Sequence, residues 1–152
     1  MQELFVKAGQ LIGRSQKILC IAHRKPDGDS LGTALAFHYA LTAQGRQVDL
    51  ACIDEPASTF AFLPGIKKFR REIEPAAYDL LIVCDAGASY MTKYHEIHPT
   101  IFDGSIPVIN IDHHASNDNF GTLNIVDVNS ASTTLLLYKM LRFLELKITP
   151  EM

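Results

Sequence analysis

The chain has 152 residues, of which 47% are hydrophobic and 20% are charged, so it can fill one ordinary globular core. Its formal net charge of -3 argues against avid, nonspecific binding of duplex nucleic acid, which needs many cations to neutralise phosphates. No apolar run reaches the length of a membrane span, and residues 1–7 lack the basic and long apolar regions of a signal peptide. We therefore expect a protein without a membrane partner.

The three cysteines, Cys20, Cys52 and Cys84, are widely spaced, and each lies in a predicted strand. An odd number at this spacing is typical neither of a disulfide framework nor of a zinc-binding motif. We expect reduced thiols in the core of a cytoplasmic protein.

Helices and strands are expected to alternate through the first part of the chain. Apolar residues recur at helical spacing near the amino terminus: Leu4, Phe5, Ala8, Leu11 and Ile12. This opening helix should precede a strand over residues 17–22. Asp29 then suits the N-cap of a second helix, which ends at residues 44–46 before a strand over residues 47–53.

The pattern weakens over residues 54–78, where we expect a short helix near residues 58–62 and a turn at Pro64-Gly65. The same stretch contains a basic run at residues 67–71, which is more typical of a solvated edge than of a nucleic-acid site. His38 lies on the apolar stripe of the second helix, so we expect it to be a hydrogen-bonded core residue.

The second half of the chain continues the alternation of elements. Strands are expected at residues 80–84, 106–111 and 122–126. We also expect a helix of undetermined length between residues 90 and 102, with His95 and His98 facing solvent, and a final helix over residues 131–146. This order predicts an α/β domain with a doubly wound, mainly parallel sheet flanked by helices on both faces.

Three polar clusters directly follow three of the apolar strands. The first contains His23, Asp27 and Asp29, the second is Asp85, and the third is Asp112-His113-His114. Almost wholly apolar strands are typical of a parallel sheet that is buried on both faces. Ligands bind such sheets beyond the carboxyl ends of the strands, where the three clusters would meet. The sequence therefore predicts a metal site, and more specifically a site for two ions.

The spacing of the donors indicates how two ions would be held. Asp27 and Asp29 occupy alternate positions of the chain, so their carboxylates can serve different ions. Asp85 comes from another strand and is placed to bridge both ions with its two oxygens, while His113 would complete the second site. Carboxylates mixed with imidazoles favour Mn, Fe, Co or Zn over an all-oxygen Mg site.

A site of this kind predicts phosphoryl-transfer chemistry that depends on Asp85 and His114. Two ions roughly 3.5–4 Å apart would clamp the attacking and leaving oxygens of an in-line displacement. His114 would sit beside the ions, free to contact the phosphate or to protonate a leaving group. Arg24 and Lys25 are candidate anion contacts on the first polar loop, although either could simply face solvent.

These motifs resemble those of a known enzyme family. The pattern His23-x-x-x-Asp27-x-Asp29-Ser30-x-Gly32, the strand-terminal Asp85 and Asp112-His113-His114 are similar to the first three motifs of the DHH phosphoesterases. That family includes RecJ-type single-strand exonucleases, oligoribonuclease/pAp phosphatases, cyclic-dinucleotide phosphodiesterases, exopolyphosphatases and manganese-dependent inorganic pyrophosphatases. Residues 22–30 and 111–117 are most similar to the oligoribonuclease/pAp phosphatase branch.

The resemblance implies a Mn-dependent phosphoesterase that acts on short single-stranded oligonucleotides or on small phosphorylated nucleotides such as pAp. It implies that one Mn²⁺ is held by His23, Asp27 and Asp85. It implies that the other is held by Asp29, Asp85 and His113. Mg²⁺, Co²⁺ or Zn²⁺ could take the same places.

The resemblance also implies roles for the remaining residues of the third cluster. Asp112 would lie behind the ligands and orient them, and His114 would contact the phosphate. The residues alone allow two interpretations of Asn117, which could orient a ligand histidine or merely hold a turn.

The chain departs from the family pattern downstream of the histidine pair. Relatives supply one more metal-ligating aspartate in a segment resembling Asp-Thr-Gly, and they carry a C-terminal substrate-binding domain; residues 1–152 include neither. Asp118 or Asp127 could replace the missing ligand. We expect residues 1–152 to be the amino-terminal catalytic domain, ending before the last metal-binding motif.

These departures keep other functions open. The chain could be a catalytically weak module that binds metal and phosphate, or a pyrophosphatase or cyclic-dinucleotide phosphodiesterase of the same family. The final helix has an apolar face that could be partly uncovered and could promote a homodimer: Leu135, Leu136, Tyr138 and Leu141.

Overall fold

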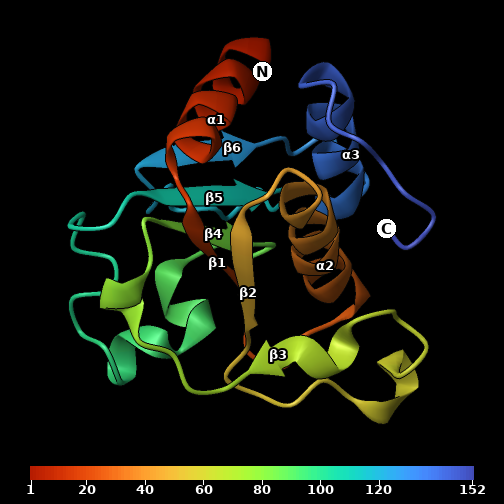
Figure 1. The fold of residues 1–152 in the computed structure, drawn as a ribbon. Coiled ribbons are helices and arrows are strands. Elements are labelled where there is room, and N and C mark those ends of the chain that lie inside the picture. The colour runs from red at the N-terminus through yellow and green to blue at the C-terminus, as the bar shows by residue number, and fades with distance from the viewer.

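A six-stranded sheet forms the centre of the computed structural model, which describes residues 1–152 (Figure 1). Every neighbouring pair of strands is parallel, in the order β3-β2-β1-β4-β5-β6. The strands are β1 (Lys17–Ala22), β2 (Gln47–Ala51), β3 (Phe69–Arg70), β4 (Leu80–Cys84), β5 (Val108–Asp112) and β6 (Leu123–Val126). The chain winds outward from β1 in one direction and then from β4 in the other, which confirms the predicted doubly wound α/β fold.

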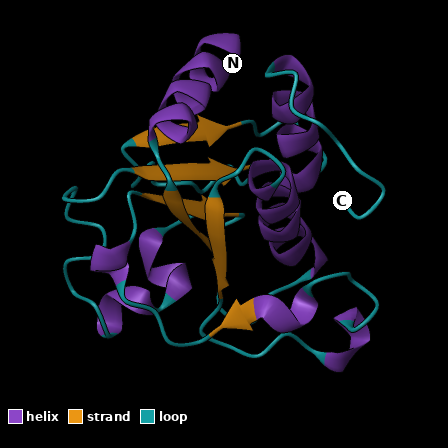
Figure 2. Cartoon of the chain, in the orientation of Figure 1, coloured by secondary structure: helices purple, strands orange, loops and turns teal.

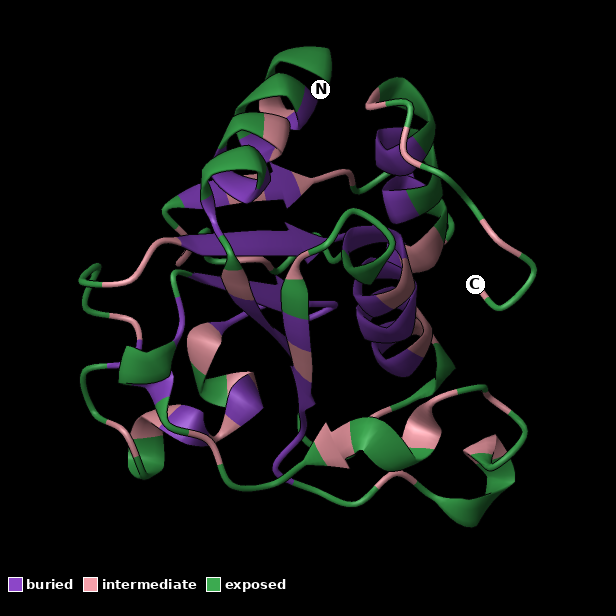
Figure 3. Cartoon of the chain, in the orientation of Figure 1, coloured by how far each residue is buried: buried purple, intermediate pink, exposed green.

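The three central strands are buried on both faces. Every residue of β4 and β5 is buried, as is every residue of β1 after Lys17. Figure 3 shows that the buried residues are concentrated in the central strands and in the helix beside them. Continuous apolar runs suit such strands because neither face meets water, which is why residues 17–22 and 80–84 could be assigned from the sequence.

All three α-helices contribute to the core on one face of the sheet. They are α1 (Gln2–Arg14), α2 (Gly28–Thr42) and α3 (Thr133–Phe143), and their apolar residues join the sheet in a cluster of 25 buried side chains. A separate cluster of 11 buried residues covers the other face, where Tyr94 is fully buried. Short 3₁₀ helices and loops replace α-helices there (Figure 2).

The predicted helix between residues 90 and 102 forms as two short 3₁₀ helices, Ser89–Thr92 and Tyr94–Glu96. Lys93 separates them with a left-handed φ of 64°, which no α-helix can contain. The helix expected near residues 58–62 is also a 3₁₀ turn, Ser58–Phe60.

The N-cap of α2 is Asp27, so the expectation that Asp29 caps this helix is wrong. Asp27 Oδ1 accepts hydrogen bonds from the backbone N–H groups of Asp29 (3.1 Å) and Ser30 (2.9 Å). Ser30 returns the contact, because its hydroxyl oxygen accepts from the Asp27 backbone N–H (3.2 Å) and completes a capping box. Asp29 therefore lies in the first turn, where its carboxylate is free to face another element.

The structure also bears on several smaller features of the sequence. Cys20, Cys52 and Cys84 are free and buried. The basic run at residues 67–71 is exposed apart from Phe69 and includes β3, the strand at one edge of the sheet. On α3, Leu135 is 39% exposed and Tyr138 is 47% exposed, whereas Leu136 and Leu141 are buried in the core, so only two of the four residues expected on an uncovered face are uncovered. None of the helices has the length and apolarity that crossing a membrane requires.

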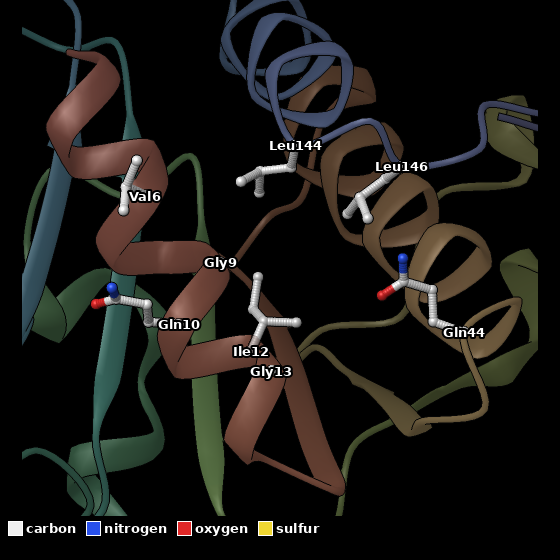
Figure 4. Close-up of a pocket in the computed structure, with 8 residues that line it drawn as sticks. All are labelled: Val6, Gly9, Gln10, Ile12, Gly13, Gln44, Leu144 and Leu146. Carbon is white, nitrogen blue, oxygen red and sulfur yellow. The ribbon is translucent and has the colours of Figure 1, made fainter.

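An apolar pocket of about 340 Å³ lies between α1, Gln44 at the end of α2, and the segment that follows α3 (Figure 4). Val6 and Ile12 line it from α1, and Leu144 and Leu146 line it from the opposite side. Its lining contains no titratable side chain and no member of the three polar clusters. It is therefore separate from the chemistry discussed below.

His38 on α2 is a buried, hydrogen-bonded histidine, as predicted. Its Nδ1–H donates to the Val48 carbonyl (2.8 Å), which leaves Nε2 as the acceptor for the Lys68 ammonium (2.8 Å). Burial and the Lys68 charge lower the pKa of His38 below its ordinary 6.5, because a second proton would have neither solvent nor an acceptor.

We expect His38 to make the fold sensitive to mild acid. Since the unfolded chain binds a proton at this position more readily than the folded one, the free energy of unfolding should decrease as the pH drops below 6.5. Urea unfolding at about pH 7.5 and about pH 5 should therefore show a smaller loss in His38→Gln than in the unchanged chain. An equal loss in both proteins would contradict this. In Lys68→Met, NMR titration should give a higher pKa for His38.

Candidate metal centre

The structure brings the three polar clusters together at the carboxyl ends of β1, β4 and β5, which are adjacent in the sheet. His23 follows β1, and Asp85 follows β4. Asp112 is the last residue of β5, and His113 and His114 come directly after it. Asp27 and Asp29, from the start of α2, complete the group.

The first half of the cluster is built around His23. Its Nδ1–H donates to the Arg24 carbonyl (2.7 Å), because a carbonyl oxygen can only accept. Nε2 therefore presents its lone pair, and it lies 3.7 Å from Asp27 Oδ1 and 3.8 Å from Asp85 Oδ2. A backbone contact that fixes the tautomer in this way is typical of metal-binding histidines.

The second half repeats this arrangement around His113. Its Nδ1–H donates to the Ser130 carbonyl at 3.2 Å. Its Nε2 lies 3.7 Å from Asp29 Oδ2 and 3.7 Å from Asp85 Oδ1. The two imidazoles thus face different oxygens of a single carboxylate, that of Asp85.

Asp85 is held in an unusual position at the centre of the cluster. It is 1% exposed, and its backbone has a left-handed φ of 60°, a conformation that aspartate tolerates better than most residues. Its backbone N–H still donates to the Ile111 carbonyl of β5 (2.9 Å). Burial opposes ionisation, but His23 and the Thr133 hydroxyl outweigh it and lower the pKa of Asp85, so the carboxylate is charged at neutral pH.

The spacing of these donors fits divalent cations better than it fits hydrogen bonds. The four nitrogen–oxygen distances of 3.7–3.8 Å exceed the hydrogen-bond range. Donors that each lie about 2.1 Å from a shared ion are roughly 3–4 Å from one another. Two groups of three donors satisfy such a geometry, with all atoms of a group within 4.8 Å: His23, Asp27 and Asp85, and Asp85, His113 and His114.

His114 is geometrically close to the second group but is not suited to bind an ion through the atom that approaches it. That atom is Nδ1, which lies 3.8 Å from Asp85 Oδ1 and only 2.7 Å from Asp112 Oδ1. The short contact to a carboxylate requires a proton on Nδ1, so its lone pair is not available. Asp29 Oδ2, close to His113 Nε2, is therefore the better third donor of this group.

Asp112 and Asn117 hold His114 in place. Asn117 Nδ2 donates to Asp112 Oδ2 (2.6 Å) and to the Ala86 carbonyl (3.2 Å), and its Oδ1 accepts from the Asn119 backbone N–H (2.8 Å). Asn117 thus both holds a turn and orients Asp112, which in turn contacts His114. The Asp112 contact raises the pKa of His114 and favours its protonated form.

The remaining candidates lie at the edge of the cluster. Arg24 and Lys25 are exposed on the loop between β1 and α2, and the Lys25 backbone N–H donates to Asp54 (2.8 Å). Asp127 Oδ1 accepts from the Asn129 backbone N–H (3.1 Å). Neither Asp118 nor Asp127 belongs to the two donor groups.

Two threonines at the start of α3 were missed by the sequence reasoning. The Thr133 hydroxyl donates to Asp85 Oδ1 (2.6 Å), and the backbone N–H groups of Thr133 and Thr134 donate to Asp29 (2.8 Å each). The stretch Ser132-Thr133-Thr134 marks a helix start, but the Asp29 contacts span more than 100 positions of the chain. No local pattern reveals a contact of that range.

The fold and the cluster together define a parallel α/β domain with carboxylates and imidazoles at the ends of its central strands. The family model described as "DHH family, N-terminal domain" matches residues 17–152, and the chain belongs to this family. The resemblance of the three motifs is thereby confirmed.

Two curated relatives carry the name "Bifunctional oligoribonuclease and PAP phosphatase NrnA". The protein from Thermus thermophilus is 29% identical over 140 residues, covering 88% of this chain and 39% of the relative. The protein from Bacillus subtilis is 24% identical over 123 residues, covering 81% of this chain and 37% of the relative. The chain thus spans well under half the length of either relative.

A crystal structure of an exopolyphosphatase-related protein from Bacteroides fragilis has the same fold. The two structures align with a TM-score of 0.85 at 21% identity, over 93% of this chain and 44% of the other. At this identity the likeness demonstrates the architecture alone.

Proposed function

We propose that this chain is the catalytic domain of a metal-dependent phosphoesterase that hydrolyses short oligonucleotides or pAp-like nucleotides. One observation supports this more than any other. Two imidazoles, each with a backbone carbonyl holding its Nδ1–H, face the two oxygens of one buried carboxylate at 3.7–3.8 Å. These distances are too long for hydrogen bonds, and they match the separation of donors that share an ion.

Two Mn²⁺ ions fit the donors that the chain provides. We propose that His23, Asp27 and Asp85 hold one ion. We propose that Asp29, Asp85 and His113 hold the other. When bound, such ions activate a water molecule and neutralise charge on the phosphate. A mixture of carboxylates and imidazoles suits Mn²⁺, Co²⁺ or Zn²⁺ better than Mg²⁺, which prefers oxygen ligands.

The surrounding side chains would bind the phosphate and move a proton. Asp112 holds the His114 imidazole through Nδ1, so Nε2 is the nitrogen left for substrate. With a raised pKa, His114 can donate a proton from Nε2 to a phosphate oxygen or to the leaving group. Arg24 and Lys25, both exposed beside His23, would supply positive charge for the anionic substrate.

The substrate class is supported by the names of the two curated relatives, an oligoribonuclease and a PAP phosphatase in one protein. Short single strands and pAp both present a phosphate ester of a nucleotide, which one site of this kind can accommodate. Buried free thiols at Cys20, Cys52 and Cys84 support a location in the reducing cytoplasm.

A second candidate function is the binding of metal and phosphate without turnover. The observation that favours it is the state of Asp29, whose two oxygens already accept backbone N–H bonds from α3. A carboxylate engaged in this way has fewer lone pairs to offer an ion, so the second site would be weak.

Hydrolysis by the metal-free protein before and after addition of Mn²⁺ distinguishes the two functions. We expect release of phosphate from pAp and cleavage of a short oligoribonucleotide only after Mn²⁺ is added. Tight Mn²⁺ binding in calorimetry with no turnover would reject the phosphoesterase proposal and support the binding module. Faster turnover of inorganic pyrophosphate or a cyclic dinucleotide would instead reassign the substrate within the family.

A further inference from the structure

The start of α3 contacts two carboxylates of the cluster that come from different elements. Thr133 is fully buried, and its hydroxyl donates to Asp85 Oδ1 at 2.6 Å. Its backbone N–H donates to Asp29 Oδ2 at 2.8 Å. A single residue therefore ties the end of β4 and the first turn of α2 to a third element.

These contacts use donors that the helix leaves free. The first backbone N–H groups of any α-helix have no partner within the helix. In α3 the Ser132 side chain accepts from the Leu135 N–H (3.0 Å), and the N–H groups of Thr133 and Thr134 are left for Asp29. A charged carboxylate at this position is also favoured by the helix dipole.

The Thr133 hydroxyl provides the sole hydrogen bond that the Asp85 side chain accepts. The other neighbours of this carboxylate are His23, His113 and His114, all at 3.7–3.8 Å. The terminal torsion of aspartate has a broad, two-fold energy profile, so the torsion itself does not set the plane of the carboxylate. With Oδ1 held by Thr133, Oδ1 faces His113 and Oδ2 faces His23.

We propose that Thr133 is a positioning residue that fixes the plane of the Asp85 carboxylate, so that each oxygen serves one of the two metal sites. The inference rests on the proposed function, because it concerns how the same donors bind ions. Thr133 acts through Asp85, and it has no direct contact with substrate in this proposal.

Three variants at this position separate positioning from packing. Thr133→Val keeps the branched shape and removes the hydroxyl, Thr133→Ala removes the hydroxyl with a smaller group, and Thr133→Ser keeps the hydroxyl. Thr92→Val is the matched control, because Thr92 is also fully buried and its hydroxyl donates to the Ser89 carbonyl (2.9 Å) outside the cluster.

Calorimetric titration of each metal-free protein with Mn²⁺ is the deciding measurement. We expect Thr133→Val and Thr133→Ala to bind Mn²⁺ roughly 10–100-fold more weakly, the usual effect of losing a group that orients a ligand. Thr133→Ser should retain the affinity of the unchanged chain, and so should Thr92→Val. Thermal unfolding in EDTA should show that Thr133→Val and Thr92→Val both lower the unfolding temperature. Weaker Mn²⁺ binding by Thr133→Val alone then cannot be a consequence of lower stability.

The outcomes separate this inference from the proposed function. If the unchanged chain binds Mn²⁺ and Thr133→Val or Thr133→Ala binds it equally well, the positioning role is wrong while the metal site stands. If Thr133→Ser is as impaired as Thr133→Val, the hydroxyl is not the cause and the inference is again wrong. If the unchanged chain binds no Mn²⁺, the proposed function and this inference are both rejected.

Discussion

Asp85→Asn is expected to abolish the binding of both metal ions, and with them the hydrolysis of phosphoesters. The substitution keeps the size of the side chain, and asparagine tolerates the left-handed φ of 60° at this position. It removes the charge that faces both His23 and His113. Bound ions contribute several kcal/mol of charge stabilisation to phosphoryl transfer, so turnover should decrease on the order of 10³-fold or more.

Calorimetry with Mn²⁺ measures the binding part of this prediction directly. The control is Asp49→Asn, because Asp49 is a partly buried aspartate outside the cluster that pairs with Arg70 (2.8 Å) and Tyr78 (2.9 Å). The control should bind Mn²⁺ as the unchanged chain does. If Asp85→Asn still binds one Mn²⁺ ion tightly, Asp85 is a ligand of only one site. If it still binds both ions, Asp85 is not a metal ligand.

His114→Gln is expected to reduce turnover while leaving metal affinity unchanged. His114 Nδ1 is occupied by Asp112, so the imidazole offers no lone pair at that atom to an ion and instead offers a proton at Nε2. Loss of a proton donor in the transition state reduces rates by roughly 10²–10⁴-fold. The effect should therefore appear in kcat for pAp or an oligoribonucleotide, with an unaltered Mn²⁺ titration.

His98→Gln serves as the matched control, because His98 lies after the 3₁₀ helix Tyr94–Glu96, on the other face of the sheet and outside the cluster. It should retain the turnover of the unchanged chain. A loss of Mn²⁺ affinity in His114→Gln would make His114 a ligand, since its ring lies within 4.8 Å of the donor atoms of Asp85 and His113. Unchanged turnover would show that His114 has no part in proton transfer.

Asp29 connects the donor cluster to the start of α3. Asp29 accepts backbone N–H bonds at the start of this helix and also faces His113, so one carboxylate both caps a helix and belongs to the donor cluster. Asp29 is partly buried, and these contacts satisfy both oxygens of its carboxylate. The Asp29 carboxylate is therefore held in place before any ion binds, so that binding would require little further ordering of this side chain.

The sequence by itself determined the central strands and the place where their polar residues meet. Strands buried on both faces are nearly continuous apolar runs, so residues 17–22 and 80–84 could be recognised without any partner being known. A parallel sheet brings the carboxyl ends of its strands to one edge. The convergence of His23, Asp85 and His113 follows from these two rules.

Local sequence patterns could not choose between two neighbouring residues that suit the same position in a helix. Both Asp27 and Asp29 suit an N-cap, and the choice of Asp27 depends on where the loop from β1 enters the helix. The segment over residues 89–96 forms 3₁₀ turns because Lys93 takes a left-handed conformation between them. Such backbone details depend on how the loop packs against the sheet.

Only the tertiary structure decided which donors support the cluster from a distance. The contacts of Thr133 with Asp29 and Asp85, and of Lys68 with His38, join residues that are 104, 48 and 30 positions apart. Periodicity and capping patterns report on neighbours within a few positions of the chain, whereas these pairs meet because helices and strands pack side by side. Local chemistry thus indicated what the site is made of, and long-range packing set how its carboxylates are oriented.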